Sequence, residues 1–377
     1  MKFNLLFVAI LPSVAWALVP LYGVNAADRE RPNASQAPFV SIRTIGIGTT
    51  TAATTTTTTS KTTTTTTSKT SSTTSKTTTS ATSTSSSSVP SGAITVGKNG
   101  VGKYSTITEA LADTSSNIIY IYPGNYTEQV VISRSNIKIY GQTSSKLAYS
   151  SNTVTISRYM SAATAGSNDL SGTVRVLATG VSLYNLNIEN TYGKGAQAIA
   201  LSVQAGTFGC YACQLRGYQD TLLANKDTQF YGKCFISGAT DFIFGSAASI
   251  WITGSTIQTL ASGYITASGR SSDDGNYYVI DHSTVTGTGT SYLGRPWRNY
   301  ARVIFQNSNL GSNVPAAGWT QWSTATPNTD YILFGEYNNS GAGAWNSGRA
   351  SFATLLTAPI SITTVLGSTS WIDATYL

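Results

Sequence analysis

A short repeat constrains the fold of this chain more than any other feature of its sequence. When the stretch after residue 213 is shifted by 21 residues, Gly217 falls on Gly238 and Asp220 falls on Asp241. A repeat of this length is typical of one turn of a parallel β-solenoid. Equivalent residues of successive turns then lie one strand spacing apart, roughly 4.8 Å. The repeat therefore predicts that the side chains of Asp220 and Asp241 lie next to each other on one face.

Two neighbouring carboxylates have a chemical consequence. They do not both ionise readily, so the pKa of one is expected to rise while the pKa of the other stays low. Such a pair can supply one acid together with one nucleophile or base. If the chain is an enzyme, Asp220 and Asp241 are the first candidates for its chemistry.

The region after residue 93 has the texture of an all-β domain. Short runs of β-branched and aromatic residues alternate with clusters of Gly, Asn and Ser, which favour turns. The expected strands are Ile118–Tyr122, Val130–Ile132, Ile137–Tyr140, Val181–Leu183, Ile250–Ile252, Tyr277–Ile280 and Val303–Phe305. An immunoglobulin-like sandwich is the competing all-β fold, but it explains the 21-residue offset poorly.

One helix is expected near the start of this domain. Thr106-Ile107-Thr108-Glu109 has the pattern of a capping box ahead of an apolar run. A short helix here would cover the open end of the solenoid, an edge that otherwise invites aggregation.

The first 17 residues have the pattern of a secretory signal peptide. Lys2 precedes an apolar run from Leu5 to Ala17, which ends in the small-x-small site Ala15-Trp16-Ala17. The alternative is a membrane anchor, but the run is shorter than the ~20 residues that a spanning helix needs. No later stretch of the sequence is long and apolar enough to span a membrane. We expect a secreted, extracellular protein.

The chain is expected to have four segments. Residues 1–17 are the signal peptide, and residues 18–47 form a short segment expected to be disordered. Residues 48–92 are almost wholly Thr, Ser and Lys, which indicates an extended, O-glycosylated linker or stalk, or a plain flexible tether. Residues 93–377 form the β-helix domain.

The three cysteines allow two arrangements. An odd number in a secreted protein leaves at least one thiol outside any intramolecular disulfide. Cys213 and Cys234 stack in the 21-residue register and could form a disulfide, with Cys210 left over, or could remain two buried thiols. With the single histidine they make no zinc site of sensible spacing. N-glycosylation sequons begin at Asn33, Asn125 and Asn338.

The net charge of +7 favours a polyanionic partner. Nucleic acid is not expected, because neither a basic stripe nor a recognised motif supports it. An acidic polysaccharide suits an extracellular protein better. Part of the positive charge lies in the lysines of residues 48–92, so the excess on the domain is smaller.

Carboxylates are the expected catalytic groups. His282, the only histidine, lies in an apparent strand, and no Gly-x-Ser-x-Gly motif of a serine hydrolase occurs. Glutamine amides such as Gln197 and Gln219 can stabilise an oxyanion. Arg295 can hold a carboxylate in its ionised form, and Trp297 offers a flat surface for a sugar ring.

Several motifs in a fixed order make residues 96–377 resemble the pectin methylesterase family. The motifs are Thr106-Ile107-Thr108-Glu109-Ala110-Leu111, Pro123-Gly124-Asn125-Tyr126-Thr127-Glu128, Gln197-Ala198-Ile199-Ala200-Leu201, Gly217-Tyr218-Gln219-Asp220-Thr221-Leu222, Asp241-Phe242-Ile243-Phe244-Gly245 and Leu293-Gly294-Arg295-Pro296-Trp297. Each alone is weak, but together they are specific. The resemblance implies a right-handed parallel β-helix with a cleft along its side.

The resemblance also implies a role for each matched residue. Asp241 resembles the nucleophile that attacks the methyl ester of galacturonate, and Asp220 the acid that protonates methanol and then the base that activates water. Gln197 and Gln219 resemble the oxyanion donors, and Arg295 the residue that orients Asp241. The aromatic residues of the sugar subsites correspond to Trp297, Phe244 and Tyr218. No metal or organic cofactor is implied, and a monomer is expected.

Some alternatives remain open at this point. Leu223 stands where many members carry tyrosine, so a subsite contact is expected to differ. Asp220 and Asp241 could instead cap turns, and Trp297 could belong to the core. A pectin lyase or polygalacturonase would share the coil, although calcium-dependent lyases need an acidic cluster and acidic residues are sparse here. A pectin-binding protein without turnover is the non-enzymatic alternative.

Overall fold

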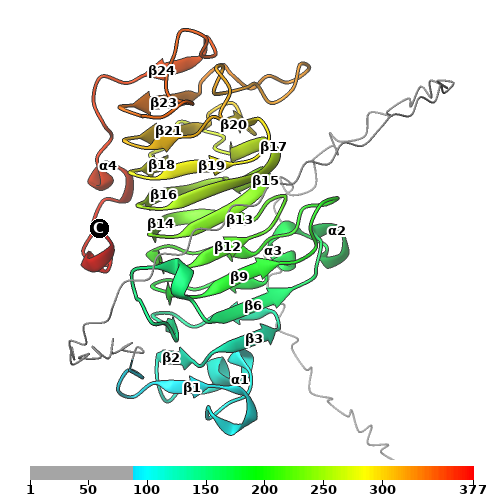
Figure 1. Ribbon diagram of the computed structural model, residues 1–377, viewed down its shortest axis with the longest axis vertical. Coiled ribbons are helices and arrows are strands. Elements are labelled where there is room, and N and C mark those ends of the chain that lie inside the picture. Colours follow the sequence, from blue (N-terminus) through cyan, green and yellow to red (C-terminus); the bar gives the residue numbers. More distant parts are fainter. Residues whose placement is uncertain (1–87) are drawn as a thin grey trace, which may run out of the picture. The chain divides into compact units, whose positions relative to one another are not determined.

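The computed structural model describes residues 88–377, which belong to one compact unit. The sequence predictions for residues 1–17, 18–47 and 48–87 concern parts of the chain outside this described range. Within it, the chain forms a parallel β-helix, in which each strand pairs with equivalent strands of neighbouring turns (Figure 1). The β-solenoid predicted from the 21-residue repeat is confirmed. The strand pairs are parallel, which is incompatible with an immunoglobulin-like sandwich.

The first face of the coil is an eleven-stranded sheet. Its strands in spatial order are β1 (Ile94–Val96), β2 (Ile118–Ile121), β5 (Lys138–Gly141), β8 (Ser182–Tyr184), β11 (Phe208–Tyr211), β14 (Lys226–Gly232), β16 (Ala247–Thr253), β18 (Tyr278–Asp281), β21 (Arg302–Gln306), β23 (Leu333–Tyr337) and β24 (Ala353–Leu355). Six of the seven strands expected from the sequence lie in this sheet, and the seventh is β4 of the second sheet.

The second sheet bends to form the other two faces of the coil. One face holds β3 (Gly124–Thr127), β6 (Val154–Arg158), β9 (Asn187–Asn190), β12 (Gln214–Arg216), β19 (Thr284–Gly287) and β22 (Asn309–Leu310). The other holds β4 (Val130–Ile132), β7 (Val174–Val176), β10 (Leu201–Val203), β13 (Leu222–Ala224) and β20 (Ser291–Pro296). Two long strands, β15 (Phe235–Gly245) and β17 (Thr256–Ser268), run across both faces and join them.

The core consists of apolar rows that run from turn to turn inside the coil. Ile119, Ile139, Leu183 and Cys210 are successive register partners on the first face, and all four are buried. Because side chains alternate across a strand, Tyr120 beside Ile119 points to the outside instead. Apolar β-branched residues at every second position therefore build the interior row by row.

Helices are few and short in the described range. They are α1 (Ile107–Ala112), α2 (Ala162–Ala165), α3 (Asn168–Ser171) and α4 (Ile362–Leu366), with 3-10 turns at Lys98–Gly100, Tyr149–Ser151 and Ala374–Tyr376. The predicted capping box at the start of α1 is confirmed: the Thr106 hydroxyl accepts from the amide of Glu109, and the Glu109 carboxylate accepts from the amide of Thr106. α1 packs against β1, β2 and β4, with Ile107 and Ala110 buried.

The three cysteines are free thiols, and all are buried. Cys213 and Cys234 do occupy equivalent positions, since the adjoining residues Gln214 and Phe235 are register partners. Of the two arrangements left open by the sequence, the structure has buried thiols rather than a disulfide.

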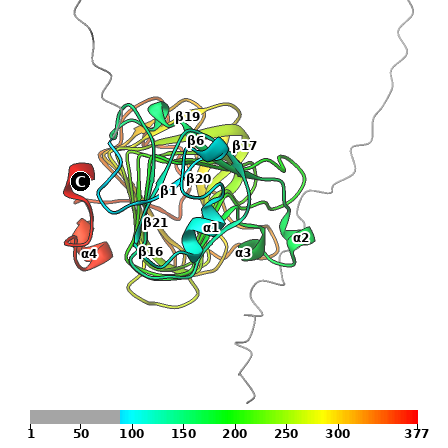
Figure 2. The ribbon, with the colours of Figure 1, turned by 90° about the horizontal axis from the view of Figure 1, so that it is seen from below.

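The C-terminal segment lies outside the coil, against the first face. α4 contacts β14 and β16, and Figure 2 shows it beside the ring of strands rather than within it. Val365, Leu366 and Tyr376 are buried there, in a second apolar cluster with Phe230 and Trp251 of the sheet. Both sides of the first sheet thus carry apolar contacts along this part of the coil.

Candidate active site

Asp220 and Asp241 occupy equivalent positions of successive turns, as the 21-residue repeat predicts. Leu222 is the register partner of Ile243, and Gln219 pairs with Thr240. The amide of Asp220 donates to the carbonyl of Thr240 at 3.0 Å. The two aspartates therefore lie on adjacent turns, at the bend between the two faces of the second sheet.

The backbone at both aspartates has an unusual conformation. Asp220 has φ 65 and Asp241 has φ 50, in the left-handed region that few non-glycine residues adopt. Both residues are buried, with exposed fractions of 0% and 1%. Non-glycine residues in this conformation carry local strain and cluster at functional sites. Their burial distinguishes the pair from a surface carboxylate such as Asp227, which is exposed and also has a positive φ, 57.

Arg295 binds Asp241 with two hydrogen bonds. Its Nε lies 2.9 Å from Oδ1 of Asp241 and its Nη2 lies 2.8 Å from Oδ2. The arginine reaches the aspartate from β20, because Ala267 of β17 pairs with both Phe244 of β15 and Arg295. A two-pronged arginine–carboxylate pair is both strong and directional. It fixes the plane of the Asp241 carboxylate.

The contact with Asp241 also stabilises the positive charge of Arg295. Burial by itself disfavours the guanidinium cation, but the hydrogen bonds and charge of Asp241 outweigh burial, with a smaller contribution from Asp220. The net result is that the pKa of Arg295 is raised above its usual value. The cation is thus retained in a site that excludes most solvent.

Gln197 and Gln219 lie on adjacent turns beside the aspartates. The carbonyl of Gln219 accepts from the amide of Ala198 at 3.1 Å, so the segment with Gln197 runs alongside the segment with Gln219. Both glutamines are half-buried. Since Gln219 directly precedes Asp220, the backbone segments that carry both glutamines run beside the segment that carries the carboxylate pair.

Two of the three aromatic residues of the predicted sugar site, Phe244 and Trp297, pack together in a small apolar cluster separate from the main core. Phe244 and Trp297 have ring centroids 6.3 Å apart and are 1% and 6% exposed. Leu223, the residue that departs from the family pattern, is buried in the same cluster. Tyr218 is half-buried, and its carbonyl accepts from the amide of Ala239. The indole of Trp297 is thus largely packed, and only a small part of it is exposed.

Two residues near Arg295 were not predicted from the sequence. The Arg295 Cζ lies 3.9 Å from the ring centroid of Tyr264 and 4.1 Å from that of Trp322. The 21-residue period could not find them, because later turns are longer: Thr266 pairs with Gly294, 28 residues on.

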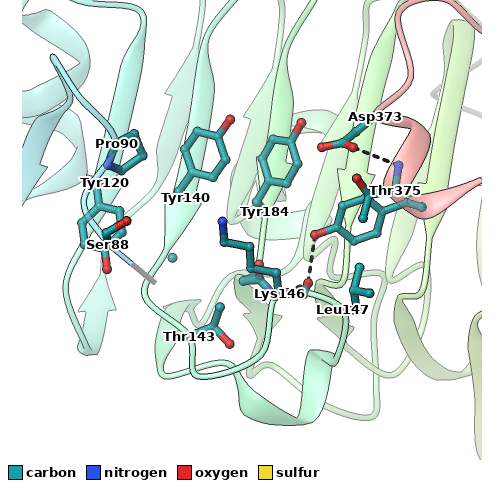
Figure 3. A pocket seen from close by; sticks show the side chains of 13 residues that line it. Ser88, Pro90, Tyr120, Tyr140, Thr143, Lys146, Leu147, Tyr184, Asp373 and Thr375 are labelled. Carbon is teal, nitrogen blue, oxygen red and sulfur yellow. Dashed lines mark hydrogen bonds between the residues drawn. The ribbon is translucent and has the colours of Figure 1, made fainter. Parts of the chain in front are cut away.

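A hollow lies away from the aspartate pair, on the outer surface of the first face. Its volume is about 550 Å³, and Tyr140 and Tyr184 stack in its wall with ring centroids 4.5 Å apart (Figure 3). The carboxylate of Asp373, which also lines it, accepts from the amide of Thr375 and caps the last 3-10 turn. This hollow belongs to a different sheet from the aspartate pair, so its size does not make it the active site.

Residues 88–377 offer neither a group of metal-binding side chains nor a helix that could span a membrane. Histidine, cysteine and acidic side chains do not gather in groups of three or more that could hold a metal ion in this range. No helix in the described part of the chain is long and apolar enough to cross a membrane.

Comparison with known proteins gives one consistent family. The family model described as Pectinesterase matches residues 93–364. A pectinesterase from Aspergillus aculeatus is 47% identical over 309 residues, covering 76% of this chain and 93% of that protein. A pectinesterase from Aspergillus niger is 45% identical over 309 residues, again covering 76% of this chain and 93% of that protein.

Solved structures agree with this result. The crystal structure of the deglycosylated pectin methylesterase from Aspergillus niger matches with a TM-score of 0.72 and 44% identity, covering 77% of this chain and 99% of that chain. The pectin methylesterase from carrot matches with a TM-score of 0.70 and 28% identity, covering 77% of this chain and 98% of that chain.

Proposed function

This chain belongs to the pectinesterase family, and from that premise we propose that it demethylates pectin with Asp241 as nucleophile and Asp220 as acid and base. The reaction itself is hydrolysis of the methyl esters of galacturonate units, which releases methanol and leaves acidic pectin. The observation that carries the proposed role of Asp241 is its paired contact with Arg295. The guanidinium binds both carboxylate oxygens of Asp241, through Nε and Nη2.

The first half of the reaction forms an acyl-enzyme. A carboxylate oxygen of Asp241 attacks the ester carbonyl carbon, and the carbonyl electrons move onto its oxygen. The amides of Gln197 and Gln219 donate hydrogen bonds to this oxyanion. When the carbonyl re-forms, the bond to the methoxy oxygen breaks and Asp220 gives that oxygen a proton. Methanol leaves, and the galacturonyl group is bound to Asp241 as an anhydride.

The second half returns the enzyme to its starting state. Asp220, now a carboxylate, takes a proton from water while the water oxygen attacks the galacturonyl carbonyl. The same two amides stabilise the second oxyanion. Its collapse breaks the bond to Asp241, which leaves as a carboxylate. Each proton lost by Asp220 in the first half is regained in the second, so the pair is regenerated without a co-reactant.

Arg295 contributes by orientation and charge. A carboxylate held at both oxygens keeps one direction of attack, and the positive charge of Arg295 lies beside it throughout. Trp297, Phe244 and Tyr218 are proposed to contact the sugar chain. These roles rest on the position of the residues around Asp241 and on the family's chemistry.

The proposed localisation, oligomeric state and segment boundaries rest on the sequence and on where pectin occurs. We propose that the protein is a secreted, extracellular monomer that acts on cell-wall pectin, with residues 1–17 as signal peptide, 48–92 as linker and 93–377 as catalytic domain. Of its sequons, Asn125 and Asn338 lie in the described range, and both residues are exposed. Intact mass before and after enzymatic removal of N-glycans checks their occupancy, and sedimentation checks the monomer.

The decisive test combines methanol release with sizing of the polymer. The wild-type protein should release methanol from methyl-esterified pectin without shortening it. Asp241→Asn should lower this rate by about 10⁴-fold or more, as for other nucleophiles, while circular dichroism stays unchanged. Unsaturated ends would indicate a lyase, shortened saturated chains a polygalacturonase, and binding without methanol a non-enzymatic protein. Undiminished methanol release by Asp241→Asn would overturn the nucleophile assignment.

A further inference from the structure

The guanidinium of Arg295 is enclosed on more sides than its bond to Asp241 requires. The carboxylate occupies one edge of the guanidinium, through Nε and Nη2. The rings of Tyr264 and Trp322 lie over its central carbon at 3.9 Å and 4.1 Å. Two rings cannot share one face of so small a group at these distances, so they cover its two faces. The Tyr264 and Trp322 rings are called the aromatic clamp below.

Tyr264 comes from a strand whose register is fixed. It is the partner of Thr240 in β15 and of Tyr292 in β20. The rings of Tyr264 and Tyr292 stack with centroids 6.0 Å apart and an interplanar angle of 23°. Both rings also line a hollow of about 320 Å³ that includes Thr240, the residue before Asp241. One side of the clamp is therefore built into the sheet that holds the nucleophile.

Trp322 comes from a loop that is tied to the strand of Arg295. Asn328 donates from its side-chain amide to the carbonyls of Pro296 and Trp297, at 3.2 Å and 3.0 Å. The amide of Trp322 donates to the carbonyl of Pro327, which closes the loop across a short turn. The loop that delivers the indole is thus anchored one residue beyond Arg295 itself.

The chemistry of these contacts suits a positioning role. An aromatic face attracts a guanidinium, and the attraction is stronger where water is excluded. A guanidinium that is held along one edge only can still tilt out of its plane. With both faces covered, the guanidinium keeps its plane, and the plane of the Asp241 carboxylate follows through the paired hydrogen bonds.

We propose that Tyr264 and Trp322 are positioning residues that act on Asp241 through Arg295, and that the clamp sets the direction of nucleophilic attack. This inference rests on the proposed role of Asp241. Neither ring is required to touch the ester. Loss of one ring lets the guanidinium tilt, which misaligns the carboxylate without weakening substrate binding elsewhere.

The test compares variants that keep a ring with variants that remove it. Tyr264→Leu and Trp322→Leu should each lower kcat by about 10- to 100-fold, because a small displacement of a reacting group costs this much. KM should stay nearly unchanged in Tyr264→Leu. Trp322 also packs against the cluster of Phe244 and Trp297, so Trp322→Leu is judged by kcat. Tyr264→Phe and Trp322→Phe keep an aromatic face and should restore most of kcat. Tyr277→Leu is the matched control, since Tyr277 covers Arg302 at 4.4 Å in an equivalent contact unrelated to Asp241. It should leave kcat unchanged.

A spectroscopic readout separates positioning from general destabilisation. The Nε–H signal of Arg295, assigned by its loss in Arg295→Lys, should exchange slowly with water in the wild type and fast in the two leucine variants. The phenylalanine variants should keep it slow. Slow exchange and wild-type kcat in both leucine variants would overturn the proposal, as would equal losses in the leucine and phenylalanine variants. This signal is measured without substrate, so it tests the clamp even if the wild type releases no methanol.

Discussion

At the scale of single residues, backbone conformation positions the chemistry. Asp220 and Asp241 both have positive φ, which for a non-glycine residue costs roughly 1–3 kcal/mol in a constrained site. Gly245, at the end of β15, has φ 153, and a Cβ there would lie 1.8 Å from the carbonyl oxygen of Ala224. Only glycine fits at this position. The strand after Asp241 thus passes closer to the neighbouring turn than any other residue would allow.

Arg270 shows that a second buried arginine has a purely structural task. Its side chain is 4% exposed and bonds to Asp273, to Asp274 and to the carbonyl of Tyr300, which closes the loop between β17 and β18. Burial of Asp274 would raise its pKa, but hydrogen bonds from the Asn276 amide and Arg270 outweigh burial, so the pKa of Asp274 is lowered.

The sign of the resulting pH dependence follows from that shift. A carboxyl whose folded pKa is below its unfolded value, about 3.9, stabilises the fold above that pH and stops doing so as the pH falls through the folded pKa. Arg270→Gln should therefore lower the unfolding temperature most at neutral pH, with the difference from wild type shrinking toward pH 3. Thermal melts across this range check it, with exposed Arg216→Gln as control. A difference that grows in acid would contradict the assignment.

At the scale of elements, β15 and its neighbours build the site. β15 pairs with β12 at its start and with β13 at its end, so it bends across two faces at Asp241. Against β17 its register shifts twice, between Gly238 and Thr240 and between Thr240 and Ile243. Such irregularities re-aim side chains and occur next to active sites. Here they place Tyr264 opposite Thr240, the residue before Asp241.

The burial of the three cysteines leads to a prediction about the reactivity of their thiols. Cys210, Cys213 and Cys234 are buried and free, and burial raises the pKa of the Cys210 thiol well above its usual value. All three should therefore resist a thiol reagent in the native protein and react in denaturant. Counting modified cysteines by intact mass checks this. One reactive cysteine in denaturant without reductant would mean that a disulfide has formed.

The contact between residues of successive turns could be predicted from the sequence where the length of the turn is constant. Between Gly217 and Gly245 successive turns keep the 21-residue offset, so the pairing of Asp220 with Asp241 could be predicted. Beyond β15 the offset grows to 28 residues, and Tyr264 and Trp322 could not be placed. The expectation that His282 is a strand residue was wrong. It follows β18 with φ 42, at a corner of the coil, because Asp281 ends the strand and bonds its ring.

At the scale of the whole described unit, the two sheets have different tasks. The bent second sheet carries the aspartates and Arg295, while the first sheet is covered outside by the C-terminal segment. That cover buries Tyr211, Phe230 and Trp251 of the sheet. Gln306 binds the backbone of Ile360 in both directions, which fixes where the segment begins. Stability and catalysis should therefore respond separately to changes in the segment.

Deleting residues 361–377 tests this separation. Burying a large apolar side chain contributes about 1.5–3 kcal/mol, so re-exposing three rings should cost roughly 5 kcal/mol or more. The truncated protein should unfold at a markedly lower temperature and bind a hydrophobic dye. At low temperature, its kcat per folded molecule should match the full chain. A truncated protein with unchanged stability but no activity would contradict the separation.

The central claim is that Asp241 forms the covalent bond and Asp220 resolves it, and one measurement tests it most directly. Asp220→Ala is mixed with an oligogalacturonate ester whose nitrophenol leaving group needs no acid, then quenched in acid within milliseconds and mapped by mass spectrometry. The account predicts a burst of nitrophenol and a galacturonyl adduct on the peptide with Asp241, because no base remains to activate water. An adduct on another residue, or full turnover without any adduct, would contradict it.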